Sequence, residues 1–290
     1  MSTRSTEARG PRVVARGVAP VPAVRRANIG GAPVDLRSRS EAIDEIVRAA
    51  KDRGGGAALG VASANLDHVH HFGRRGRWGE TMYGAPSVRW LTLLDGHPLV
   101  TRVRRLHGGG WPRLAGSDLI EELLDRAECE GLSVGFLGGT SAAHALLAER
   151  IERRWPQLRV VGYWAPERSA VVEPDRARTL ALAVAECGPQ LLFVGLGKPR
   201  QELWIADYGA FTGASVMLAF GASADFVSGA VRRAPEWIAH SGLEWLWRLG
   251  CEPRRLARRY LVQGPPAYLD VHMHSQLEPP TIPRPRRRDG

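Results

Sequence analysis

Short apolar runs alternate with amphipathic stretches over most of the chain. The runs Ala57–Ala64 and Ser87–Gly96 have the length of buried strands, and the stretch Glu41–Gly54 places Ile43 and Ile46 at helical spacing. Further strands are expected at Leu132–Gly139, Leu158–Trp164, Gln190–Gly197 and Ser215–Ala222, with helices expected at Gly116–Gly131, Ser141–Pro156, Asp175–Gly188 and Arg200–Phe211. This alternation predicts βαβ units, and therefore an α/β fold with a doubly wound, mostly parallel sheet.

Changes of composition divide the chain into four parts. Residues 1–27, rich in proline and arginine, are expected to form a disordered basic arm, and residues 28–233 contain the α/β core. Residues 234–262 combine tryptophan and tyrosine with arginine, and form a C-terminal helical appendage in which Pro253 can begin a helix. Residues 263–290 are expected to be a disordered tail rich in proline and arginine.

The charge of the chain suggests an anionic partner. The formal net charge is +10 and the pI is near 10.4, which fits nucleic acid, an anionic membrane surface or a phosphorylated substrate. A genomic bias towards arginine is an equally good explanation of much of this excess. The three cysteines have no zinc spacing, which indicates a reduced, intracellular compartment. The sequence has no run of 18 apolar residues, so a membrane-spanning helix is not expected.

Polar side chains follow several of the expected strands. Ser63 and Asn65 come at the end of one apolar run, Asp95 ends the next, and Gln201 opens the helix after a third. In doubly wound sheets ligands bind outside the carboxyl ends of the strands, so these residues are candidates for a site. Each also has a purely structural explanation, since Ser63 and Asn65 can cap a helix and Asp-Gly is a common turn.

A fourth strand end carries Gly138 and Gly139 directly before a helix. Free backbone N–H groups and the helix dipole favour a phosphate there, although the glycine fingerprint is incomplete and no Walker lysine follows. The histidines His68, His70 and His71 do not share one helical face, which favours packed or solvated side chains over a metal site. The chain contains no Asp-x-Asp motif of the kind that holds a metal–diphosphate in many sugar-nucleotide enzymes.

Taken together, these motifs resemble those of one family. In chain order they are "ANLDHV", "LLDGHPLV", "PRLAGSDL", "VGFLGGT", "LLFVGLGKPRQELWI", "FGASADFVSGAVRRAPEWI" and "GLEWLWRLGCEPRRLARRYL". This order is similar to that of the WecG/TagA/CpsF glycosyltransferases, glycosyltransferase family 26. The resemblance covers about residues 28–262.

The resemblance implies a fold, an activity and a set of partners. It implies a Rossmann-like core with a C-terminal appendage, and inverting transfer of a sugar of the N-acetylmannosamine type from a UDP-sugar to a polyprenyl-diphosphate-linked acceptor. It further implies a role in cell-surface polysaccharide synthesis, peripheral association with the cytoplasmic face of the membrane, and no cofactor or required metal. Whether the protein forms a homo-oligomer stays open.

The resemblance also implies roles for individual residues. Asp95 matches the family's candidate base, which takes the proton of the acceptor hydroxyl. Residues expected to bind the substrate are Ser63, Asn65, Arg113, Gly138, Gly139, Gln201, Arg248, Arg255 and Arg258. The arginines would offset the charge of the departing UDP, because their forked donors suit phosphate oxygens. Ser63 stands where the family has threonine, so it keeps the hydroxyl and loses the methyl group.

Two other functions remain as alternatives. An NAD-dependent Rossmann oxidoreductase would need a complete glycine fingerprint followed by an acidic residue, which the chain lacks. A nucleic-acid-binding protein is suggested by the charge alone, because no helix-turn-helix, zinc-finger or RNP signature supports it. Nucleic acid is therefore not an expected partner.

Overall fold

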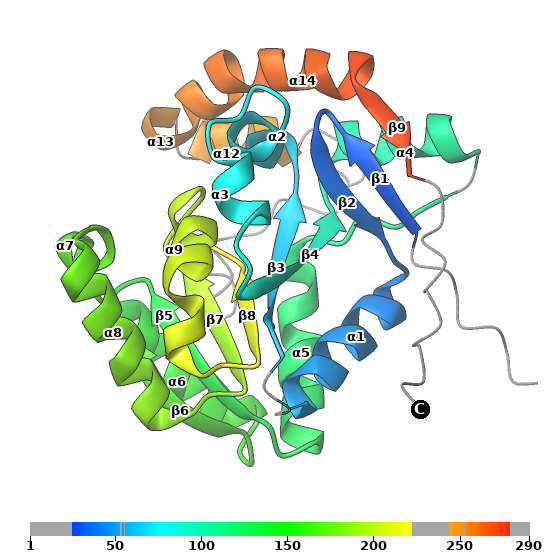
Figure 1. Cartoon of the computed structure of the whole chain (residues 1–290). Helices are drawn as coiled ribbons and strands as arrows, with labels where there is room; N and C mark the ends of the chain where they lie inside the picture. The colour runs from blue at the N-terminus through cyan, green and yellow to red at the C-terminus, as the bar shows by residue number, and fades with distance from the viewer. Residues whose placement is uncertain are drawn as a thin grey trace, which may run out of the picture.

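A mixed sheet forms the centre of the molecule. The computed structural model describes residues 25–278, apart from residues 53, 55, 109, 222–243 and 252. Within these residues nine strands form one sheet of order β6-β5-β7-β8-β3-β4-β2-β1-β9 (Figure 1). The strands are β1 (Arg25–Ile29), β2 (Ala32–Leu36), β3 (Ala58–Ala64), β4 (Val88–Leu94), β5 (Ser133–Gly138), β6 (Arg159–Trp164), β7 (Leu191–Gly195), β8 (Val216–Ala219) and β9 (Ser275–Leu277).

Most neighbouring strands run parallel. Every pair from β6 to β2 is parallel, whereas β1 is antiparallel to both β2 and β9. Helices cover both faces: α1 (Arg39–Lys51), α5 (Gly116–Cys129) and α6 (Ser141–Arg154) pack on one, and α2 (Leu66–Phe72), α3 (Gly79–Tyr83), α8 (Pro174–Cys187) and α9 (Arg200–Tyr208) on the other. This arrangement confirms the predicted α/β fold, because a parallel sheet must bury both faces.

The first helix shows how local sequence sets an element. Ser38 caps α1 in a capping box with Glu41, and Ile43 and Ile46 are buried against the sheet as their spacing predicts. The helix ends at Lys51 with Asp52 as its C-cap, so the expected stop at Gly54 is wrong by a few residues. Short helices α4 (His97–His107) and α7 (Arg168–Val172) and the 3₁₀ turn η1 (Gly209–Thr212) complete the connections.

The C-terminal region differs from the prediction. The appendage contains α12 (Glu244–Cys251), α13 (Pro253–Ala257), which begins at Pro253 as expected, and the π-helical segment η2 (Arg258–Gln263). The expected disordered tail from residue 263 is wrong for its first half, because α14 (Gly264–Met273) and β9 continue the fold and β9 pairs with β1. Residues 279–290 lie outside the described part of the chain.

Burial explains why this segment folds. Ala267 and Val271 of α14 are buried against the β1–β2 hairpin, in a small core that also contains Ile29 and Val34. Two prolines stand in the first turn of α14, where a missing N–H costs nothing. Figure 1 shows α14 lying across one end of the molecule, from η2 towards the hairpin. The boundary expected at residue 27 is also late, since β1 begins at Arg25, while residues 1–24 lie outside the described chain.

Candidate active site

Asn65 and Asp95 meet where β3 and β4 end. The Asn65 side chain accepts from the His68 N–H at 3.2 Å as N-cap of α2, so its predicted capping role is confirmed. Its amide nitrogen Nδ2 also donates to Asp95 Oδ2 at 3.4 Å. The Asp95 N–H donates to the Ala64 carbonyl at 2.9 Å, which continues the β3–β4 ladder by one step. Asn65 thus joins a helix cap to the carboxylate of the next strand end.

The Asp95 carboxylate is fixed but open to solvent. Its Oδ1 accepts from the Gly96 N–H at 2.7 Å, and its side chain is 14% exposed. Gly96 has φ of +76°, a conformation that favours glycine and that turns the chain sharply into α4. The turn therefore leaves a carboxylate at the carboxyl edge of the sheet, held from behind by two donors, the Gly96 N–H and the Asn65 amide.

Arg113 lies beside this carboxylate. Its Nη1 is 3.8 Å from Asp95 Oδ1, and its Nη2 is 2.7 Å from Asp118 Oδ2. The loop that carries Arg113 is tied to the strand end, since the Leu114 N–H donates to the Leu94 carbonyl at 2.7 Å. With 38% of its side chain exposed, the guanidinium lies at the surface of the site.

Ser63 does not cap the helix that follows its own strand. Its side chain instead contacts the start of α5. Its hydroxyl accepts from the Gly116 N–H at 3.0 Å. The loop from Arg113 to Gly116 is therefore fastened at both ends, by the Leu94 carbonyl and by Ser63 Oγ. Ser63, Asn65, Asp95 and Arg113 form one cluster.

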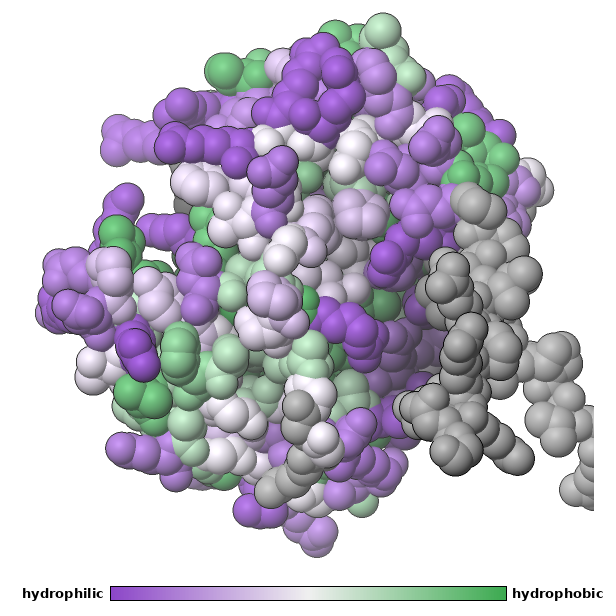
Figure 2. All heavy atoms as spheres, viewed as in Figure 1, coloured by the Kyte–Doolittle hydropathy of each residue, from purple (hydrophilic) through white to green (hydrophobic). Residues whose placement is uncertain are grey.

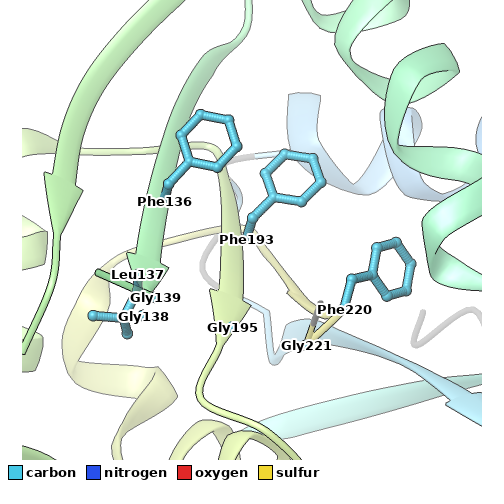
Figure 3. Close-up of a pocket in the computed structure, with 8 residues that line it drawn as sticks. All are labelled: Phe136, Leu137, Gly138, Gly139, Phe193, Gly195, Phe220 and Gly221. Atoms are coloured by element: carbon cyan, nitrogen blue, oxygen red, sulfur yellow. The ribbon is translucent and has the colours of Figure 1, made fainter. Parts of the chain in front are cut away.

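Gly138 and Gly139 border a small recess at the ends of β5, β7 and β8. Phe136, Phe193 and Phe220 form its apolar wall, and glycines from the three strand ends lie at the arrowheads in Figure 3. Gly138 has φ of +99°, and a Cβ atom there would lie 2.5 Å from the Gly195 carbonyl oxygen. Only glycine allows this approach, which leaves backbone at the mouth of the recess.

Gln201 is buried beside the same recess. Its Nε2 donates to the Ala219 carbonyl at 2.7 Å, and only 3% of the residue is exposed. Its Oε1 has no hydrogen-bond partner among the described residues, and a Cβ atom built on Gly221 would lie 3.0 Å from it. Because Gly221 lines the recess, this buried acceptor lies directly behind it.

The C-terminal segment contacts α2, the helix that Asn65 caps. Arg259 Nε lies 3.4 Å from Asp67 Oδ2, and Asp67 is buried two residues after the Asn65 cap. Burial alone would raise the pKa of Asp67, but the His71 hydrogen bond and the charges of Arg259 and Lys198 hold it below its ordinary value. Arg258 is exposed on η2, whereas the side chains of Arg248 on α12 and Arg255 on α13 lie outside the described part of the structure.

Comparison with known proteins assigns this arrangement to a family. The family model "Glycosyl transferase WecG/TagA/CpsF family" matches residues 27–279, which include every residue of the cluster. The chain belongs to this glycosyl transferase family. A curated relative from Bacillus spizizenii, named N-acetylglucosaminyldiphosphoundecaprenol N-acetyl-beta-D-mannosaminyltransferase, is 35% identical over 146 residues. That match covers 50% of this chain and 54% of the relative, so the chain spans about half the length of the curated relative.

In this WecG/TagA/CpsF family member the predicted residues of the core, as distinct from the three C-terminal arginines, fall into two neighbouring groups. Ser63, Asn65, Asp95 and Arg113 lie at the ends of β3 and β4, and the glycines with Gln201 border the recess at β5, β7 and β8. Among the described residues, no group of three or more His, Cys, Asp or Glu side chains is arranged to hold a metal ion.

Sequence reasoning favoured packed or solvated histidines here but did not predict the contacts behind the site. His68 is fully buried, and its Nε2 lies 2.7 Å from the Tyr83 hydroxyl. Lys198 reaches the same histidine from the β7–α9 loop. His68 and Lys198 stand near Asn65 and Gln201 in the motifs, which was the only indication in the sequence. No local pattern shows that the two side chains meet.

Proposed function

We propose that this protein is an inverting glycosyltransferase that moves a sugar from a UDP-sugar to a polyprenyl-diphosphate-linked acceptor sugar. The observation that carries the proposal is the grouping of Asp95, Asn65 and Arg113 at the carboxyl edge of the sheet, in a chain of this family. The donated sugar is of the N-acetylmannosamine type, in line with the name of the Bacillus spizizenii relative. The product belongs to cell-surface polysaccharide synthesis.

The proposed reaction needs one base and a stabiliser for one leaving group. The acceptor hydroxyl attacks the anomeric carbon while Asp95 takes its proton, and the bond from that carbon to the UDP phosphate oxygen breaks. Asn65 and the Gly96 N–H orient the carboxylate from the protein side, so that its open edge meets the acceptor. Negative charge develops on UDP, and Arg113 lies where it can offset that charge.

The other proposed contacts bind the donor. Gly138 and Gly139 expose backbone near the N-terminus of α6, where a phosphate is favoured, and the free Gln201 Oε1 can accept from a sugar or base. Arg248, Arg255 and Arg258 belong to the segment that is docked on α2 through Arg259. We assign these arginines to the diphosphate.

We also propose peripheral association with the inner face of the cell membrane. The η2–α14 surface exposes Leu261 (61%), Val262 (64%), Leu269 (53%) and Met273 (70%), next to the exposed Arg258. Figure 2 shows hydrophobic patches among hydrophilic ones along the end of the molecule where α14 lies. Apolar side chains beside arginine suit a surface of anionic lipids, where the acceptor resides. No helix in the described ranges has both the length and the apolarity needed to cross a bilayer.

A donor panel tests the proposed function. The full chain is incubated with several UDP-sugars and a synthetic lipid-diphosphate-N-acetylglucosamine acceptor, and products are read by mass spectrometry. Transfer from one UDP-sugar, with release of UDP, is the expected result. Absence of transfer from every donor, together with tight NAD binding or steeply salt-dependent DNA binding, would replace the proposal by one of the two alternatives.

A further inference from the structure

Lys198 uses all three protons of its ammonium group inside the protein. Its Nζ lies 2.8 Å from the Ser63 carbonyl oxygen, 3.1 Å from His68 Nδ1 and 3.3 Å from Glu202 Oε1. Only 10% of its side chain is exposed. Three acceptors for three donors leave no proton for a ligand, so Lys198 is not a substrate-binding residue.

The Ser63 carbonyl is left without a strand partner, and Lys198 supplies one. The Ala64 carbonyl accepts from Asp95 on the β4 side, and carbonyls alternate along a strand, so the Ser63 carbonyl points towards β8. There β8 has already ended, since Ala62↔Ala219 is the last pair. The ammonium from the β7–α9 loop therefore takes the next position of the ladder, across the end of β8.

The contact with His68 defines a tautomer. An ammonium group can only donate, so His68 Nδ1 accepts and the ring proton sits on Nε2, which donates to the Tyr83 hydroxyl at 2.7 Å. Burial, and then the charges of Lys198 and His71, lower the pKa of His68 well below its ordinary value, which keeps the ring neutral. His68 lies in the first turn of α2, three residues after Asn65.

The third contact neutralises a buried carboxylate. Glu202 is fully buried, and within the described residues its Oε1 contacts Lys198 and Gln201 Nε2. A buried carboxylate without a counter-charge is strongly destabilising. Lys198 thus links β3, α2 and α9 at one point.

We propose that Lys198 is a positioning residue that holds Asn65 in register with Asp95. Lys198 fixes the chain on both sides of Asn65, at the Ser63 carbonyl and at the His68 ring, and Asn65 donates to Asp95. This inference rests on the proposed function, in which that carboxylate is the base. It assigns the lysine of the "GLGKPRQE" loop to the geometry of the carboxylate and not to the nucleotide.

The test separates positioning from stability. Lys198→Met alone leaves Glu202 buried without a counter-charge and is expected to unfold readily, so Lys198→Met/Glu202→Met replaces both partners with apolar side chains. Lys51→Met/Glu130→Met is the matched control, because Lys51 is the other lysine of the chain and pairs with Glu130 on the surface. We expect the Lys198 double variant to melt within a few degrees of the wild type, with kcat on the order of tenfold to a hundredfold lower and an unchanged KM for the donor.

Two readouts do not need a substrate. Nitrogen-15 spectra of the wild type should show the His68 proton on Nε2, and the Lys198 double variant should lose this single tautomer and shift the Asn65 side-chain amide signal. Wild-type kcat in a stably folded double variant, an unmoved Asn65 signal, or a wild-type His68 proton on Nδ1 would each overturn the inference. If the wild type transfers no sugar, the proposed function fails, while the spectra still decide whether Lys198 positions Asn65.

Discussion

The guanidinium of Arg113 and the carboxylate of Asp95 lie at the same corner of the sheet edge, with 3.8 Å between Nη1 and Oδ1. Arg113 is held at this corner by Asp118 and by the Leu114–Leu94 hydrogen bond. In the proposed reaction, the base for the acceptor and the cation for the leaving group therefore belong to one cluster.

Asp95→Asn should abolish transfer and leave donor binding nearly intact. Asparagine can keep the hydrogen bond from the Gly96 N–H but cannot take a proton, so kcat should fall by roughly a hundredfold to ten-thousandfold. Calorimetric titration with UDP should give a dissociation constant close to that of the wild type. Turnover at the wild-type rate in this variant would remove Asp95 from the role of base.

Arg113→Ala should weaken both donor binding and turnover. The loss of a charge-assisted contact to phosphate corresponds to about 1.5–3 kcal/mol, or roughly tenfold to a hundredfold in kcat/KM. Arg126→Ala is the control, because the Arg126 side chain, on α5, has the same 38% exposure and also pairs with carboxylates. If both variants lose the same activity, the effect does not come from the site.

Breaking the Asp67–Arg259 ion pair should release the C-terminal segment. In Asp67→Asn, η2 and α13 lose their charged contact with α2, and hydrogen exchange of these segments should accelerate on the order of tenfold. Asp44→Asn, which removes the Arg126 partner on α1, should leave this exchange unchanged. Unchanged exchange in Asp67→Asn would show that the segment is held by other contacts.

His68 should make the protein less stable in mild acid. Burial is the main cause that lowers the pKa of His68 well below 6.5 in the folded state. Below pH 6.5 the unfolded chain therefore binds a proton that the folded chain does not. The free energy of unfolding should therefore fall as the pH drops below 6.5, by up to about 1.4 kcal/mol per pH unit for one proton.

Denaturant titrations at several pH values measure this slope. His68→Gln should reduce it, and His97→Gln, at an exposed histidine, should keep the wild-type slope. A slope in His68→Gln equal to that of the wild type would assign the pH dependence to other groups.

The η2–α14 surface should bind anionic vesicles. Leu261→Ser/Val262→Ser/Met273→Ser should reduce partition into phosphatidylglycerol-containing vesicles by roughly tenfold or more, since three exposed apolar side chains are lost. The matched control is Leu146→Ser/Val172→Ser/Leu182→Ser, which changes similarly exposed side chains on α6, α7 and α8. Equal partition of both triple variants would show that η2–α14 is not the membrane-binding surface.

Much of the fold and part of the site follow from the sequence. Continuous apolar runs such as Leu191–Val194 can only be buried on both faces, which requires a parallel sheet between helices. Strands that end at one edge bring their following residues together, which made Asn65 and Asp95 candidates for a site. The order of the motifs also predicted the glycosyltransferase family, which the family model confirms.

The tertiary structure decided the rest. Lys198 and Ser63 are 135 residues apart, and nothing near either residue indicates that the ammonium replaces a missing strand at the end of β8. Likewise, the proline-rich start of α14 reads as disorder, because the hairpin surface that buries Ala267 and Val271 comes from the other end of the chain. Local sequence fixes periodicity, caps and turns, whereas a hydrogen bond or a buried face between distant segments exists only once the sheet has brought them together.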